Sequence, residues 1–262
     1  MIGRAGLAGA LFALALSWAG SAFAAPPAET PTFGDWAAVV IAGDFHGSRG
    51  GRTEVFDNAR RDVSKELQRI GFAPDNMRQF SVRPSRYKDR PLKADPLAIY
   101  ETLFDLSAKA KSGCLVYFTS HGAPEGVLVD DKLLTPDLLS DILDATCGAR
   151  PTVVVMSACF SGVFVKPLAG RNRMILTAAR RDRTSFGCGE DSTYPFFDDC
   201  LLKSSKTARD FLVLASAVKA CVAKRETAEG MKPPSEPQIS VGGELRPLLP
   251  LYTFPTGPPP GD

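Results

Sequence analysis

The chain has 262 residues, of which 44% are hydrophobic and 23% charged, so it is long enough to bury a sizeable core in a single α/β domain. It carries 31 basic and 29 acidic side chains, and this balance gives no electrostatic reason to expect nucleic acid as a partner. No repeat or long linker divides the chain.

The amino terminus is typical of an export signal. Arg4 precedes an apolar run from Leu7 to Trp18, and Ala22-Phe23-Ala24 offers small residues at the two positions that a signal peptidase reads. A membrane anchor is the alternative, but the run is shorter than the ~20 apolar residues that a spanning helix needs. We therefore expect residues 1–24 to be a signal peptide, no stable membrane span after its removal, and a periplasmic or extracellular mature protein.

Strand and helix patterns alternate along residues 25–246, which we expect to form one domain. Trp36 to Ala42 predicts a first strand, and the glycine-rich loop after it lacks the residue spacing of a phosphate cradle. In the helix that ends at Gly71, Arg60 and Glu66 fall between the apolar positions and are expected to face solvent. Further strands are expected at 78–82, 114–119, 152–157, 173–178 and 238–241, and a helix near 207–223. Residues 247–262 are rich in proline, which predicts an extended or disordered tail.

Two buried strands each end in a reactive side chain. Cys114 to Thr119 precedes His121, and Thr152 to Ser157 precedes Cys159. A helix with the N-cap and first-turn residues Thr135-Pro136-Asp137 joins the two strands. Such a crossover makes the strands parallel and neighbouring, which brings the imidazole and the thiol to the same carboxyl edge of the sheet.

A thiol becomes a useful nucleophile when a histidine near neutrality takes its proton. Gly122 has no side chain, so its backbone N–H and that of Cys159 could both approach a developing oxyanion. Taken singly, a histidine after a strand is often a loop residue and a cysteine a small buried hydrophobe. Their matching positions at two strand ends favour a catalytic pair.

Two segments resemble the catalytic blocks of the legumain family, peptidase family C13 of the caspase-like cysteine peptidases. They are Phe118-Thr-Ser-His-Gly122 and Ser157-Ala-Cys-Phe-Ser-Gly162, and weaker similarity covers most of residues 36–200. The resemblance implies a caspase-like three-layer α/β/α sandwich with a mostly parallel sheet of about six strands. It also implies His121 as general base or acid, Cys159 as nucleophile, and Gly122 with Cys159 as oxyanion donors. His46, the second histidine, would lie farther from the thiol if the strand that precedes it pairs with the one before His121.

The segments that would bind substrate depart from the legumain pattern. Legumains carry an acidic residue two positions before the catalytic cysteine, where this chain has Ser157. Arg52 is the best match for the arginine of the family's pocket, and its spacing to the next helix also resembles that of caspases. Asp198 is a further candidate for the pocket wall. An arginine binds a carboxylate or an amide oxygen, so we expect aspartate to be accepted alongside asparagine.

The leading hypothesis is therefore an exported cysteine endopeptidase that cleaves peptides or proteins through a thioester acyl-enzyme, after asparagine or aspartate. A transamidase would use the same two residues, with an amine in place of water. A peptide-binding module on the same fold would turn nothing over. A thiol-redox protein is disfavoured because no cysteine stands in CxxC spacing.

Six cysteines in an exported chain suggest disulfides, and a catalytic thiol leaves an odd number to pair. The first pairing expected is Cys188 with Cys200, the second is Cys147 with Cys221, and Cys114 is expected to be a buried free thiol. No CxxC or HxxxH spacing supports a zinc site, so neither a metal nor another cofactor is expected.

Overall fold

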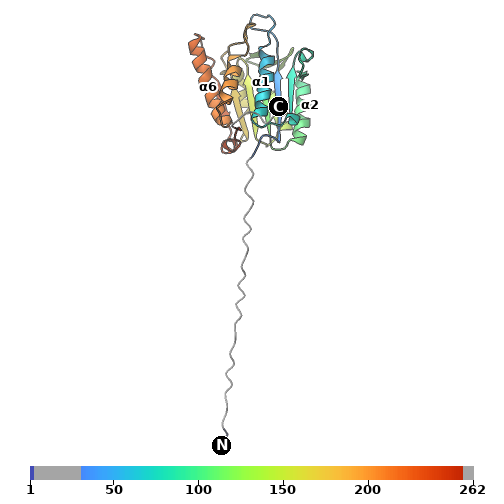
Figure 1. Cartoon of the computed structure of the whole chain (residues 1–262), viewed down its shortest axis with the longest axis vertical. Coiled ribbons are helices and arrows are strands. Elements are labelled where there is room, and N and C mark those ends of the chain that lie inside the picture. Colours follow the sequence, from blue (N-terminus) through green and yellow to red (C-terminus); the bar gives the residue numbers. More distant parts are fainter. Residues whose placement is uncertain (3–30, 256–262) are drawn as a thin grey trace.

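A seven-stranded sheet lies at the centre of the computed structural model, which describes residues 1–2 and 31–255 (Figure 1). The predicted signal peptide lies outside these residues except for its first two. The strand order is β10-β9-β8-β4-β1-β2-β3, and only β10 runs antiparallel to its neighbour. The strands are β1 (Trp36–Ala42), β2 (Met77–Ser81), β3 (Leu92–Lys93), β4 (Gly113–Thr119), β8 (Thr152–Ser157), β9 (Arg173–Thr177) and β10 (Gln238–Val241).

Helices cover both faces of the sheet, with α6 and α2 at opposite sides of the molecule in Figure 1. Alternate residues of β1 enter two separate cores: Ala38 and Val40 pack with one set of helices, Ala37 and Val39 with the other. This confirms the predicted three-layer α/β/α sandwich. The first set is α1 (Val55–Arg69), α5 (Phe196–Ser205) and α6 (Phe211–Ala228), and the second is α2 (Pro96–Lys109), α3 (Pro136–Thr146) and α4 (Val165–Leu168).

The helices α3 and α2 begin where capping residues occur in the sequence. The Thr135 hydroxyl accepts a hydrogen bond from the Leu138 N–H (3.3 Å), with Pro136 at the first helical position of α3. Asp95 caps α2 in the same way, through the Leu97 N–H at 2.9 Å. The described residues also contain four short 3₁₀ helices: η1 (Pro74–Asn76), η2 (Pro84–Arg86), η3 (Ser161–Phe164) and η4 (Leu249–Leu251).

A small antiparallel sheet between β4 and α3 was not predicted. It comprises β5 (Gly122–Ala123), β6 (Gly126–Val129) and β7 (Lys132–Leu134). Asp130, with a φ of 60°, turns β6 into β7. The apolar run of β6 followed by Asp130-Asp131 was the available signal. The sheet matters for the site because it begins directly after His121.

The carboxyl-terminal boundary at residue 246 is wrong. Leu249 and Phe254 are buried, and the Phe254 ring packs edge-on against Phe211 with ring centroids 5.1 Å apart. The segment from Pro247 to Phe254 therefore belongs to the core of the domain and is not an extended tail. The helix expected near 207–223 is α6, and α5 before it was not predicted.

Two charged residues of α1 lie in the interior, where solvent exposure was expected. Arg60 is fully buried, because its guanidinium pairs with Asp57 (2.9 Å) and Asp89 (2.6 Å). Glu66 is likewise buried, and its carboxylate accepts hydrogen bonds from Arg69. Each buried charge has an opposite charge beside it, which offsets the cost of removing it from water.

The cysteines pair differently from the prediction. The disulfides are Cys114–Cys147 and Cys200–Cys221, with Cα atoms 6.0 and 5.7 Å apart. The first ties β4 to the end of α3 and the second ties α5 to α6, so each joins elements that pack against each other. Cys159 and Cys188 are the free thiols, as an odd residual count required.

Candidate active site

The two predicted catalytic residues follow neighbouring strands at the same level. β4 pairs in parallel with β8, and the last register pair is Thr119 with Ser157. His121 and Cys159 each come two residues after this pair. The crossover through α3 thus brings them to one edge of the sheet, as the sequence predicted.

The loops that carry the two residues are in direct contact. A Cβ atom at Gly122 would collide with the carbonyl oxygen of Cys159, and it would also lie 3.0 Å from the Cβ of Ala158. Only glycine allows the backbone after His121 to approach the backbone of Cys159 this closely. The glycine of the His-Gly pair therefore has a packing role in addition to any role of its N–H.

Residues of the loop between β9 and α5 hold the Cys159 thiol. The Ser185 N–H donates to the sulfur at 3.2 Å, and the carbonyl and hydroxyl oxygens of Ser185 each lie 3.6 Å from it. Phe160, in the left-handed conformation with a φ of 56°, donates its N–H to the Arg183 carbonyl (2.7 Å). The contact between Ser185 and the thiol was not predicted from the sequence.

His121 is oriented by a backbone group. Its Nε2–H donates to the carbonyl oxygen of His46 at 2.9 Å, and the Phe56 ring packs edge-on against the imidazole. This bond assigns the proton of the neutral ring to Nε2 and leaves Nδ1 as the nitrogen that can accept a proton. Within residues 31–255, no hydrogen bond joins the imidazole directly to the Cys159 sulfur.

The His46 side chain is hydrogen-bonded within its own loop. Its Nδ1 lies 2.8 Å from the Asp44 carboxylate, and half of its side chain is exposed. The backbone carbonyl of His46, rather than its side chain, contacts His121. A pattern of side chains in the sequence cannot predict such a main-chain contact. β1 pairs with β4, which is the strand pairing on which the expectation for His46 depended.

The backbone N–H groups of Gly122 and Cys159, the expected oxyanion donors, have no hydrogen-bond partner among the described residues. The Leu128 N–H bonds to the His121 carbonyl (3.0 Å), so Gly122 and Val127 form the non-hydrogen-bonded pair of the small sheet. The Gly122 N–H therefore stays out of that ladder. The Cys159 N–H has no hydrogen-bond partner among the described residues.

Arg52 ends an exposed hairpin that follows β1. Its backbone bridges to His46, and its exposed side chain makes no ion pair or hydrogen bond with the described part of the chain. Glu190 holds this hairpin by accepting hydrogen bonds from the Gly51 N–H (3.1 Å) and the Arg49 Nε–H (3.0 Å). The loop between β9 and α5 thus supports both the thiol and the hairpin with Arg52.

Ser157 and Asp198 lie beneath the edge of the sheet and reach no open surface. The Tyr117 hydroxyl donates to the Asp198 carboxylate, and the Thr119 hydroxyl donates to it at 2.8 Å. Burial raises the pKa of Asp198 to about 7, although the hydroxyls of Tyr117, Thr119 and Ser157 act in the opposite direction. The Asp198 carboxyl therefore lies buried beneath the candidate site. Its role in substrate binding stays a prediction.

Cys188, the second free thiol, lies on the same loop as Ser185. It packs against Ala42, Val55 and Phe56, and its carbonyl accepts the Ser48 N–H at 2.9 Å. Burial, together with the neighbouring Cys159, raises the pKa of the Cys188 thiol to about 12. Cys188 is therefore a protonated, packed thiol at neutral pH.

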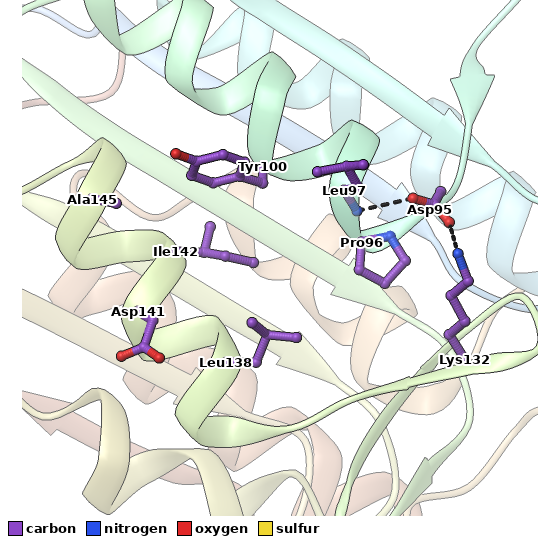
Figure 2. A pocket seen from close by; sticks show the side chains of 9 residues that line it. All are labelled: Asp95, Pro96, Leu97, Tyr100, Lys132, Leu138, Asp141, Ile142 and Ala145. Carbon is purple, nitrogen blue, oxygen red and sulfur yellow. Dashed lines mark hydrogen bonds and ion pairs between the residues drawn. The ribbon is translucent and has the colours of Figure 1, made fainter.

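A cavity of about 510 Å³ opens between α2 and α3, away from these loops (Figure 2). Leu97, Tyr100, Leu138 and Ile142 give it an apolar lining, and the ion pair of Asp95 with Lys132 closes one end. No residue of the loops after β1, β4 or β8 lines it. It is not part of the candidate active site.

No helix of the described residues is long and apolar enough to cross a membrane. The same residues contain no group of three or more histidine, cysteine, aspartate or glutamate side chains that could hold a metal ion.

Comparison with solved structures defines the class of the fold. The chain is similar to the crystal structure of caspase-1 from Spodoptera frugiperda, with a TM-score of 0.57 and 16% sequence identity over 81% of this chain and 88% of that chain. The fold is therefore caspase-like. Residues 105–233, which include His121 and Cys159, match the Peptidase C13 family, and the protein is a caspase-like member of that family. No curated protein sequence shows a significant match.

Proposed function

We propose that the protein is an exported cysteine endopeptidase that uses Cys159 and His121 to cleave after asparagine or aspartate. The family and the fold are those of cysteine peptidases in general. The observation that carries the finer assignment is the contact between Gly122 and the Cys159 carbonyl, which joins the two loops with the reactive side chains above the same sheet edge.

In the proposed reaction, the Cys159 sulfur attacks the carbonyl carbon of the scissile bond while its proton passes to Nδ1 of His121. The oxygen that gains negative charge accepts hydrogen bonds from the Gly122 and Cys159 N–H groups. His121 then gives the proton to the leaving amine as the C–N bond breaks. Water attacks the resulting thioester and releases the acid, which restores the thiol.

The bond from His121 Nε2–H to the His46 carbonyl supports this assignment of the two ring nitrogens. It keeps the acceptor nitrogen free and holds the ring against rotation, as an orienting group does in other nucleophile and base pairs. The thiol is held independently by Ser185. Substrate binding has to bring the two groups into proton-transfer range, because no direct bond joins them among the described residues.

Arg52 supports the proposed preference at the cleaved bond. Its guanidinium is without a protein partner in residues 31–255, so it is available to a carboxylate or an amide oxygen of the substrate. The two disulfides support export, because such bonds persist in oxidising compartments and are rare in the cytosol.

The deciding experiment is cleavage-site profiling on a peptide library, with Cys159→Ala as the inactive control. We expect cuts after asparagine and aspartate, and none with the variant. An acyloxymethyl ketone ending in aspartate should form one adduct, at Cys159, as seen by mass spectrometry. If the folded, reduced protein gives neither cleavage nor an adduct, the result would favour a peptide-binding module that has no catalytic activity. Export is tested by the mature amino terminus, which we expect at Ala25 in the periplasmic or extracellular fraction.

A further inference from the structure

A cavity of about 520 Å³ is lined by residues from the turn after Cys159, from the start of the loop between β9 and α5, and from the turn between β5 and β6. One wall is Gly162, three residues after Cys159, and another is Pro124, three residues after His121. A Cβ atom at Gly162 would collide with the backbone N of Arg181. The turn after Cys159 and the segment after β9 are therefore packed backbone to backbone, and the cavity has a fixed position relative to the thiol.

Two cations without protein partners line this cavity. Lys166 and Arg181 are both exposed, and neither side chain makes an ion pair or hydrogen bond within residues 31–255. The nearby Arg180, by contrast, is paired with Asp182 (2.5 Å) and Glu236 (2.9 Å). Asp182 and Glu236 are thus already paired with a cation other than Lys166 and Arg181.

Beside the two cations, the lining includes the apolar side chains of Val163, Val165 and Pro167, together with the paired Arg180 and the amide of Gln238. This combination fits a short side chain that has an aliphatic stem and a negative end. Glutamate and aspartate have that chemistry, and a guanidinium with an ammonium beside it can bind both oxygens of one carboxylate. A basic or purely apolar side chain would leave the cations unpaired.

The loop between β9 and α5 joins this cavity to the thiol and to the Arg52 hairpin. Arg180 and Arg181 line the cavity, Ser185 contacts the Cys159 sulfur, and Glu190 contacts the hairpin of Arg52. Along this one segment, the residues that line the cavity come first, the residue that contacts the thiol comes next, and the residue that contacts the Arg52 hairpin comes last. If the asparagine or aspartate of a peptide reaches Arg52, the part of the peptide beyond the cleaved bond would extend past the thiol toward the cavity.

We propose that Lys166 and Arg181 form a second specificity site, which binds an acidic side chain of the substrate on the leaving-group side of the cleaved bond. This proposal rests on the proposed function for its cleaved bond, but the binding of acidic peptides does not depend on turnover. The protein would then select segments that have acidic residues beyond an asparagine or aspartate.

The test uses three peptides that share an asparagine at the cleaved position and carry glutamate, glutamine or lysine within the next three positions. We expect kcat/KM about fivefold higher for glutamate than for glutamine, since two exposed pairs each contribute a few-fold, and lower still for lysine. Raising the salt concentration should reduce the preference, because both cations are exposed. Moving the glutamate before the asparagine should abolish the gain.

The variant Lys166→Gln/Arg181→Gln should cleave the glutamate and glutamine peptides at equal rates. The matched control is Lys224→Gln/Arg246→Gln, which removes two exposed, unpaired cations elsewhere and should keep the preference. Thermal unfolding of both variants checks that they fold.

Titration calorimetry with the same peptides on Cys159→Ala protein measures the site without catalysis. Glutamate should lower Kd by the same factor of about five. Equal Kd values for the glutamate and glutamine peptides would overturn the second site, whether or not the wild type cleaves. A lower Kd for glutamate together with no cleavage and no adduct at Cys159 would retain the site and refute the peptidase assignment.

Discussion

The backbone carbonyl oxygen of His46 accepts the Nε2–H of His121 at 2.9 Å, so one histidine orients the other through its main chain. The His46 side chain turns away to Asp44. His46→Ala keeps the carbonyl group, and we expect kcat/KM to stay within about threefold of the wild type. His121→Ala should lower kcat by at least about 1000-fold, because the proton acceptor is lost. The reverse pattern would make His46 the base.

Gly122→Ala places a methyl group against the Cys159 carbonyl. We expect kcat to fall by about 100-fold, because the N–H at this position and the nucleophile are pushed apart. The free energy of unfolding should fall by about 1–3 kcal/mol, as for other overpacked sites. Gly243→Ala is the matched control, since nothing lies within 4 Å of its added Cβ. Full activity of Gly122→Ala would show that the close contact is dispensable.

Arg52→Ala removes the unpaired guanidinium. We expect kcat/KM to fall about 10- to 100-fold for aspartate substrates and about fivefold for asparagine substrates, because a bond to a charged acceptor contributes more than one to an amide. Arg246→Ala should change neither, since it removes an exposed arginine elsewhere. Profiling that finds cleavage only after lysine or arginine would contradict the role given to Arg52.

Asp198 should give the stability a characteristic pH dependence. Its pKa is raised by burial from 3.8 to about 7 in the folded protein, so between these values the folded state keeps a proton that the unfolded state loses. The contribution of Asp198 to the free energy of unfolding is therefore complete below pH 3.8. It falls as pH rises toward about 7, by up to about 1.4 kcal/mol per pH unit. Above about 7 both states are ionised and the dependence ends.

Urea unfolding of the wild type and Asp198→Asn at several pH values measures this. Burial alone would raise the pKa values of Asp62 and Glu66, but their hydrogen bonds lower them. The contributions of these two carboxylates to the free energy of unfolding therefore oppose the trend at low pH. The difference between the two proteins removes their contribution. We expect the free energy of unfolding of the wild type to fall relative to that of Asp198→Asn as pH rises from about 4 to about 7. Above pH of about 7, the difference between the two proteins should stay constant. A difference that does not change with pH would mean an unshifted carboxyl.

The two free thiols should react at different rates. The pKa of Cys188 is raised to about 12 by burial and by Cys159, so at neutral pH it is almost entirely the unreactive thiol. Iodoacetamide should label Cys159 of the native protein first, and Cys188 only after unfolding. Native Cys159→Ala protein should take up no label, as seen by peptide mapping. Equal labelling of both positions would contradict the buried state of Cys188.

The strand arrangement around the site could be predicted from the sequence because it depends on local patterns. The apolar runs before His121 and Cys159 and the cap at Thr135 define a parallel pair, and the pairing of β4 with β8 confirms it. The resemblance to known catalytic blocks supplied the caspase-like fold. The helix α5 was missed because no side-chain cap marks its start after Pro195.

Contacts between distant segments could not be predicted in this way. Arg60 looks like a surface residue of α1 until its pairing with Asp89, in the loop after β2, is seen. The disulfide partners depend on which helices meet, and the spacing of the cysteines does not encode this. The support of His121 comes from a main-chain carbonyl, which every residue possesses, so no residue type at position 46 could reveal it.

The two disulfides lie in different layers of the sandwich, one between β4 and α3 and the other between α5 and α6, while the thiol at Cys159 belongs to neither. A reducing agent would therefore act on this protein in two opposed ways. At low concentration it keeps the nucleophile free of oxidation, and at high concentration it opens both crosslinks, each of which contributes about 3 kcal/mol. The catalytic rate and the resistance to heat would then have different optimal redox conditions.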